Sequence, residues 1–103
     1  MTRRLIIQAL AEDDITQAGI WYQAQRDGLG DEFVVEVQAA LDGVVANPRQ
    51  FPCLRRRPEV RRAITRRFPH RIFFVLRRDA VVVFRVLHNA RADREWKGKV
   101  PAG

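Results

Sequence analysis

Residues 61–76 read RRAITRRFPHRIFFVL and place five arginines and a histidine among large apolar side chains. The groups 61–65 and 71–76 are rich in β-branched and aromatic residues, which predicts two strands. Residues 72–76 are apolar at every position, which is typical of a central strand covered on both faces. The arginines then have two interpretations. They are solvated side chains at the edges of the strands, or they form a surface that binds an anion.

The segments around this stretch complete a simple order of elements. RRDA at 77–80 predicts a hairpin turn, and 81–88 predicts a last strand antiparallel to 71–76. Arg85 interrupts that strand and is expected on the face opposite Phe84 and Val86. A short apolar segment at 5–9 predicts an N-terminal strand. The arginine run 55–57 is expected in a solvated loop between the helical and strand regions.

Two helices are predicted between the first strand and the rest. Apolar residues recur at helical intervals from Ala11 to Tyr22, and we expect Trp21 and Tyr22 to lie at a helix interface. Glycines 28 and 30 end this helix and allow a tight reversal. A second helix capped by Asp31 has its own apolar stripe and stops before the proline at position 48. The order is therefore β-α-α-β-β-β, an α+β class chain with an N-terminal helical hairpin.

Composition indicates one globular domain over residues 1–103, with 47% hydrophobic and 30% charged residues. The charge is divided unevenly. Residues 1–50 hold four basic and eight acidic side chains, a net charge of −4, while 51–103 hold fifteen basic and four acidic ones, a net charge of +11. A basic second half indicates a polyanion or an acidic protein as its partner.

Several function classes are disfavoured by what the sequence lacks. No stretch approaches the roughly 18 apolar residues that a membrane span needs, and the N-terminus lacks the pattern of a signal peptide. No metal-ligand cluster, Gly-rich phosphate loop or Ser/His/Asp arrangement occurs. We therefore expect a cytoplasmic protein without membrane contact, metal or cofactor.

Four segments together resemble toxins of the ParE/RelE superfamily from bacterial type II toxin–antitoxin modules. Within this superfamily, the sequence is most similar to ParE-like plasmid-stabilisation proteins. These segments are WYQAQRDGLGDEFVVEVQAAL at 21–41, NPRQFP at 47–52, VRRAITRRFPHRIFFVL at 60–76 and VVVFRVLHNARADREW at 81–96. The resemblance implies a helical hairpin packed on one face of a small twisted antiparallel sheet. It also implies a cognate antitoxin, in a toxin–antitoxin hetero-oligomer, and a target that is either DNA gyrase or ribosome-bound mRNA.

If the chain were RelE-like, the resemblance would place its catalytic residues at His88, Arg71 and Arg91. Both arginines would stabilise charge on the scissile phosphate, and His88 would transfer a proton near neutral pH. Each residue has a structural alternative: a salt bridge from Arg71 to the helical hairpin, a solvated turn at Arg91 and a hydrogen-bonding role for His88. His70 is expected to pack rather than react.

Departures from the RelE pattern favour the ParE branch, in which the toxin poisons DNA gyrase. RelE-type enzymes use lysines and a C-terminal tyrosine as acid and base, whereas this chain has only Lys97, Lys99 and the helical Tyr22. Arginine stays protonated and is a poor proton shuttle. Two alternatives remain open: a RelE-like ribosome-dependent mRNA endonuclease, and a non-toxic nucleic-acid-binding module. The sequence therefore leaves open whether the chain is an enzyme.

The abundance of arginine in the second half is the strongest sign of a partner. Arginine suits carboxylates and phosphates because its planar fork donates two parallel hydrogen bonds. We expect the antitoxin or the target to bind a set of six arginines, namely Arg61, Arg62, Arg66, Arg67, Arg71 and Arg85.

Overall fold

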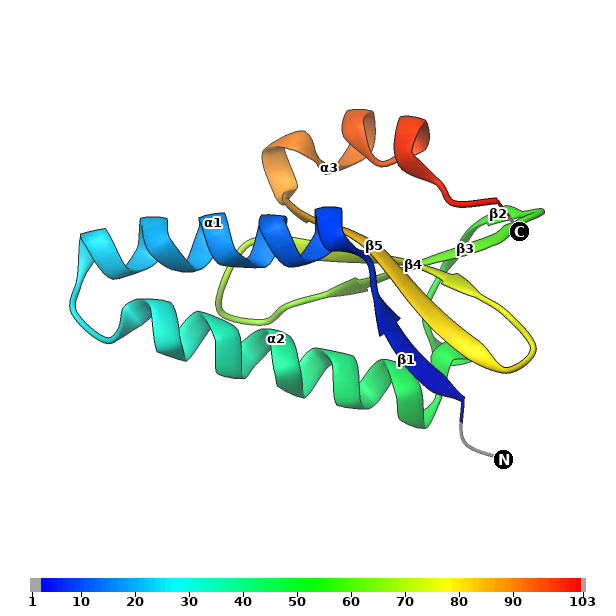
Figure 1. The fold of residues 1–103 in the computed structure, drawn as a ribbon, viewed down its shortest axis with the longest axis horizontal. Coiled ribbons are helices and arrows are strands. Elements are labelled where there is room, and N and C mark those ends of the chain that lie inside the picture. The colour runs from blue at the N-terminus through cyan, green and yellow to red at the C-terminus, as the bar shows by residue number, and fades with distance from the viewer. Residues whose placement is uncertain (1–2, 103) are drawn as a thin grey trace.

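The computed structural model describes residues 3–102 (Figure 1). Its elements follow in the order β1 (Arg4–Ile7), α1 (Ala9–Gln25), α2 (Leu29–Ala46), η1 (Pro48–Gln50), β2 (Cys53–Arg56), β3 (Glu59–Ile64), β4 (His70–Leu76), β5 (Ala80–His88), α3 (Asn89–Glu95) and η2 (Lys97–Lys99). The α+β class, the helical hairpin and the last three strands are as the sequence predicts. Within the described residues, no helix combines the length and the apolar character that crossing a bilayer requires.

In this part of the chain the sheet has five strands in the order β1-β5-β4-β3-β2, and it is mixed rather than purely antiparallel. Strands β2 to β5 are antiparallel neighbours, whereas β1 lies parallel to β5. The expectation of a fully antiparallel sheet was therefore wrong at this edge. The chain between β1 and β5 comprises the helical hairpin and the strands β2 to β4, so no tight turn forces an antiparallel direction.

Two further elements were missed in the sequence. The arginine run expected in a loop instead begins within β2, a four-residue edge strand whose side chains are largely exposed. Such a strand has no apolar alternation to reveal it. Helix α3 has only seven residues and one buried side chain, Ala92, so its periodicity is equally weak.

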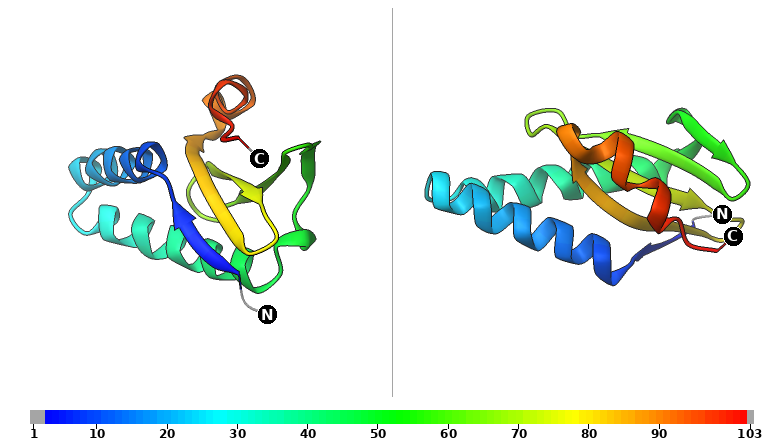
Figure 2. Two further views of the ribbon diagram at one scale, coloured as in Figure 1. Left: turned by 45° about the vertical axis from the view of Figure 1, so that its right-hand side comes forward. Right: turned by 90° about the horizontal axis from the view of Figure 1, so that it is seen from above.

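The sheet separates two apolar cores, with the helical hairpin on one face and α3 on the other (Figure 2). Side chains alternate across β4. Ile72 and Phe74 pack toward the hairpin, while Phe73 and Val75 pack toward α3, where Trp96 stacks on Phe73 at a centroid distance of 5.7 Å. The continuous apolar run of β4 is thus explained by burial on both faces, as predicted.

The hairpin depends on two glycines with different roles. Gly28 adopts a φ of 87°, a left-handed conformation, at the turn between the helices. Gly30 lies inside α2, where an added Cβ would sit 2.5 Å from the carbonyl oxygen of Gly19 on α1. The prediction that Gly30 ends the first helix and that Asp31 caps the second was wrong, because α2 begins at Leu29 and Gly28 precedes it.

This close approach predicts opposite effects for two glycine substitutions in α2. Gly30→Ala should lower the free energy of unfolding by about 1–3 kcal/mol, because the methyl group would push the helices apart. Gly43→Ala is the matched control, since its Cβ would meet nothing within 4 Å. It should raise stability by about 0.5–1 kcal/mol through helix propensity. Urea unfolding measures both, and equal stabilities would contradict the tight contact between α1 and α2.

Candidate functional site

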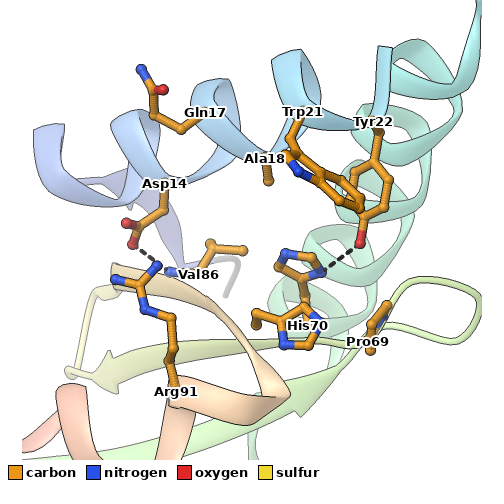
Figure 3. Close-up of a pocket in the computed structure, with 10 residues that line it drawn as sticks. Asp14, Gln17, Ala18, Trp21, Tyr22, Pro69, His70, Val86 and Arg91 are labelled. Atoms are coloured by element: carbon orange, nitrogen blue, oxygen red, sulfur yellow. Dashed lines mark hydrogen bonds between the residues drawn. The ribbon is translucent and has the colours of Figure 1, made fainter. Parts of the chain in front are cut away.

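A cleft of about 700 Å³ lies between α1, the adjoining ends of β4 and β5, and the start of α3 (Figure 3). Helix α1 supplies one wall, and the sheet ends and α3 supply the other. The residues that line it are Asp14, Gln17, Ala18, Trp21, Tyr22, Pro69, His70, Val86, His88 and Arg91. The cleft therefore combines aromatic and aliphatic walls with a few polar groups, which is the usual composition of a ligand site.

An ion pair at one end of the cleft joins α1 to β5. The Asp14 carboxylate accepts hydrogen bonds from Nε and Nη2 of Arg85 at 2.8 and 2.9 Å, and from the backbone N–H of Val86 at 2.9 Å. The side chains of Asp14 and Arg85 are only 13% and 7% exposed. Buried ions require such complete pairing. Arg85 was expected to bind a partner, but its buried guanidinium binds Asp14 of the same chain.

A β-bulge explains how Arg85 reaches Asp14. Phe73 pairs with Arg85 but Phe74 pairs with Val83, so one residue of β5 is extra. Arg85 then lies toward α1 on the same face as Val86, while Phe84 faces α3. The sequence prediction was right about Phe84 and wrong about Val86, because strict alternation fails at a bulge.

Two histidines lie side by side across β4 and β5. His70 pairs with His88 in the sheet, and their ring centroids are 5.4 Å apart. His70 is 5% exposed, and its ring contacts those of Phe33 and Tyr22. Burial first, and then the nearby His88, lower the pKa of His70 to about 4, while Asp14 opposes the shift. His70 is therefore packed, as expected, and neutral at pH 7.

His88 has a defined local role as the N-cap of α3. Its Nδ1 accepts a hydrogen bond from the backbone N–H of Ala90 at 3.1 Å. This fixes the neutral tautomer, because Nδ1 has no proton and Nε2 must carry it. His88 therefore offers the cleft one N–H donor. The hydrogen-bonding role that the sequence analysis considered for His88 is present in the structure as this helix cap.

Arg91, on the first turn of α3, is the cationic group of the cleft. Its Nε and Nη2 donate to Glu95 at 2.5 and 2.8 Å. The hydrogen bonds to Arg91 lower the pKa of Glu95, and the same contacts raise the pKa of Arg91. The guanidinium side chain is 56% exposed, and the bonds to Glu95 leave its Nη1 available.

Arg71 does not join His88 and Arg91 in the cleft. It alternates with His70 along β4 and so lies on the face of Phe73 and α3. There its Nη1 donates to Asp93 of α3 at 2.9 Å. The salt bridge considered for Arg71 exists, although the acid belongs to α3 and not to the helical hairpin. The cleft thus brings together two of the three residues that a RelE-like enzyme would use.

The remaining predicted arginines divide into paired and free side chains. Arg61 binds Glu59 at 2.7 Å, and Arg67 binds Glu32 of α2 at 2.9 Å. Arg62 and Arg66 form no ion pair with any residue in 3–102, and Nε of Arg62 has no hydrogen-bond partner there. Arg66 is exposed and therefore available to a partner, whereas Arg62 is only partly exposed and its Nε is buried.

Trp21 is a residue of the cleft that the sequence analysis placed wrongly. It was expected at a helix interface with Tyr22, and Tyr22 is indeed buried, but Trp21 is 59% exposed at the cleft. The sequence carried a signal for this. Ile20 and Trp21 fall outside the apolar stripe of α1, so they add apolar surface that the core cannot cover.

A helical hairpin on one face of a small sheet, with a short C-terminal helix on the other, defines the class of this α+β protein. Residues 5–93 match the family described as the ParE toxin of the type II toxin–antitoxin system parDE, and the chain belongs to that family. Nine chains of solved structures also match. One of them, "Chromosomal ParDE TA system from P. aeruginosa", has a TM-score of 0.71 and 16% identity, covering 84% of this chain and 96% of that chain. No curated protein sequence matches.

The buried pair at the cleft generates a stability prediction. Asp14→Ala should lower the free energy of unfolding by about 3–5 kcal/mol, because Arg85 would be left buried without its partner. Asp13→Ala is the control, since the carboxylate of Asp13 is exposed and lies next to Asp14 on the same helix. This substitution should change the free energy of unfolding by less than about 0.5 kcal/mol. Chemical denaturation measures both, and a small effect of Asp14→Ala would show that water already reaches Arg85.

Proposed function

We propose that this chain is the toxin of a type II toxin–antitoxin module, that it inhibits growth by poisoning DNA gyrase, and that a cognate antitoxin neutralises it. Membership of the ParE toxin family supports the toxin assignment. The similar solved structure is that of a ParDE toxin–antitoxin system, which supports an antitoxin as the partner. The mode of action rests on the geometry of the candidate catalytic residues.

The observation that carries the choice of gyrase is the separation of Arg71 from His88. RNA cleavage by a 2′-hydroxyl needs a base, an acid and a cation around one phosphate. Arg71 is bound to Asp93 on the α3 face, and His88 lines the cleft on the hairpin face. The rings of His70 and His88 are in contact at 5.4 Å, so no phosphate fits between them as it would between a paired acid and base.

The RelE-like alternative keeps one supporting observation. His88 and Arg91 line the same cleft, and together they would supply a proton donor and a cation. A nuclease built on this pair would still lack a well-placed general base, because His70 is buried and its pKa of about 4 makes it a weak base. We therefore rank mRNA cleavage second.

The helical hairpin offers the surface that an antitoxin would cover. Its outer side exposes Ile20, Val34 and Val35 at 59%, 47% and 68%. The 65–69 loop lies beside α2, because Arg67 binds Glu32 and its backbone N–H donates to Glu36. The apolar surface and the exposed Arg66 of this loop are therefore neighbours, which suits a segment that carries both apolar and acidic side chains.

The first test concerns the antitoxin. A double variant with Arg62→Glu and Arg66→Glu should bind the antitoxin at least about tenfold more weakly, because acidic side chains would meet like charges. The residual affinity should depend less on salt. The control carries Arg78→Glu and Arg94→Glu, an equal charge change at exposed positions of the β4–β5 turn and α3. Calorimetric titration measures both, and equal losses would leave only a general charge effect.

The second test separates the two targets. Induction of the wild-type chain should cause DNA-damage signalling and filamentation, and the purified protein should inhibit supercoiling by gyrase. Ribosomes should translate normally in its presence. A nuclease that uses His88 would lose about 100-fold or more of its cleavage in His88→Asn, which keeps a side-chain cap for α3. If the wild-type chain cut mRNA on ribosomes and this variant did not, gyrase poisoning would be rejected in favour of the RelE-like function.

A further inference from the structure

The cleft beside α1 has two chemically different ends. Trp21 and Tyr22 form an aromatic wall, with ring centroids 5.1 Å apart and planes at 83°. Arg91 lies toward the other end, beside Asp14 (Figure 3), and His88 lines the cleft next to His70, at a ring-centroid distance of 5.4 Å. The volume of about 700 Å³ falls within the range of small-molecule sites.

The aromatic end is open to a ligand. Trp21 is 59% exposed, an unusual cost for the largest apolar side chain of a helix. Its indole meets Tyr22 in a T-shaped contact, which leaves much of the Trp21 surface uncovered. Planar aromatic rings stack favourably on such a surface.

The polar end favours a negative charge. Asp14 is neutralised by two hydrogen bonds from Arg85, so its carboxylate adds little repulsion. His70 is neutral at pH 7, because burial lowers its pKa to about 4. The free donors are then Nε2–H of His88 and Nη1 of Arg91. These donors match the oxygens of a carboxylate or a phosphate.

The existing pair of Arg91 and Glu95 does not block this role. It is a surface pair spaced i, i+4 on a short helix, and such exposed pairs contribute little to stability. Glu95 uses Nε and Nη2 of the guanidinium, so the remaining edge can donate to a ligand while the pair persists. Glu95 then holds the side chain of Arg91 in place.

We propose that this cleft binds a small aromatic anion, with its ring against Trp21 and its carboxylate or phosphate on His88 and Arg91. A nucleoside monophosphate and an aromatic carboxylate are the two forms of this chemistry. The site goes beyond the proposed toxin function and does not require it, because it is defined by the cleft alone.

The two tryptophans provide a test within the unmodified protein. Trp21 lines the cleft, whereas Trp96 is stacked on Phe73 across the sheet, so their indole N–H signals give a reporter and an internal reference. Titration with AMP or with indole-3-acetate should shift the Trp21 signal saturably, with a Kd of about 1 mM or tighter, and leave Trp96 unchanged. Adenosine and inorganic phosphate should each bind at least about tenfold more weakly, because each lacks one half of the ligand.

Comparison of AMP with indole-3-acetate identifies the anionic group. Saturation by AMP alone assigns a phosphate, saturation by indole-3-acetate alone assigns a carboxylate, and either supports the site. No saturable shift with both probes at about 10 mM would overturn it. Adenosine that binds as tightly as AMP would overturn the role of the charge.

Variants then test the donors. Arg91→Ala should weaken the better probe by about tenfold or more, because it removes the only cationic donor of the cleft in residues 3–102. Arg94→Ala is the control, since this arginine is exposed on the same helix and outside the cleft, and it should stay within about twofold. His88→Asn should weaken binding while it keeps the cap of α3, which thermal unfolding verifies. Equal affinities for Arg91→Ala and Arg94→Ala would overturn the proposal.

Discussion

Strand β4 has no polar face, and the rest of the molecule follows from that constraint. Phe74 must be covered by the helical hairpin and Phe73 by a second layer, which α3 and Trp96 supply. A sheet covered on both faces can present functional groups only where its strands end. The cleft lies at such an end, and the same alternation sends Arg71 and His88 to opposite faces.

The excess of arginine beside this strand has several physical causes rather than one. Arg85 is a buried structural cation that fastens β5 to α1 through Asp14. Arg61 neutralises Glu59 on the same strand. Arg67 pairs with Glu32 of α2, so part of the positive charge of the second half balances the negative first half. Only a subset remains for a partner. A net charge computed from the sequence therefore overstates the surface that a polyanion can use.

Much of the fold was predictable because long apolar patterns define α1, α2 and the strands β3 to β5. Short elements with little buried surface, β2 and α3, left no such pattern, and the parallel pairing of β1 depends on contacts distant in sequence. The site was less predictable for the same reason. His88 and Arg91 were identified through the family resemblance, but the bulge changes the alternation around Arg85, and its partner Asp14 lies 71 residues away.

The cap on α3 links the two faces of the sheet through one imidazole. Nδ1 of His88 holds the first turn of the helix that covers Phe73, while the same ring borders the cleft on the hairpin side. An apolar residue at this position would remove the cap, at a cost of about 1 kcal/mol. The lining of the cleft and the covering of the opposite core thus depend on the same side chain.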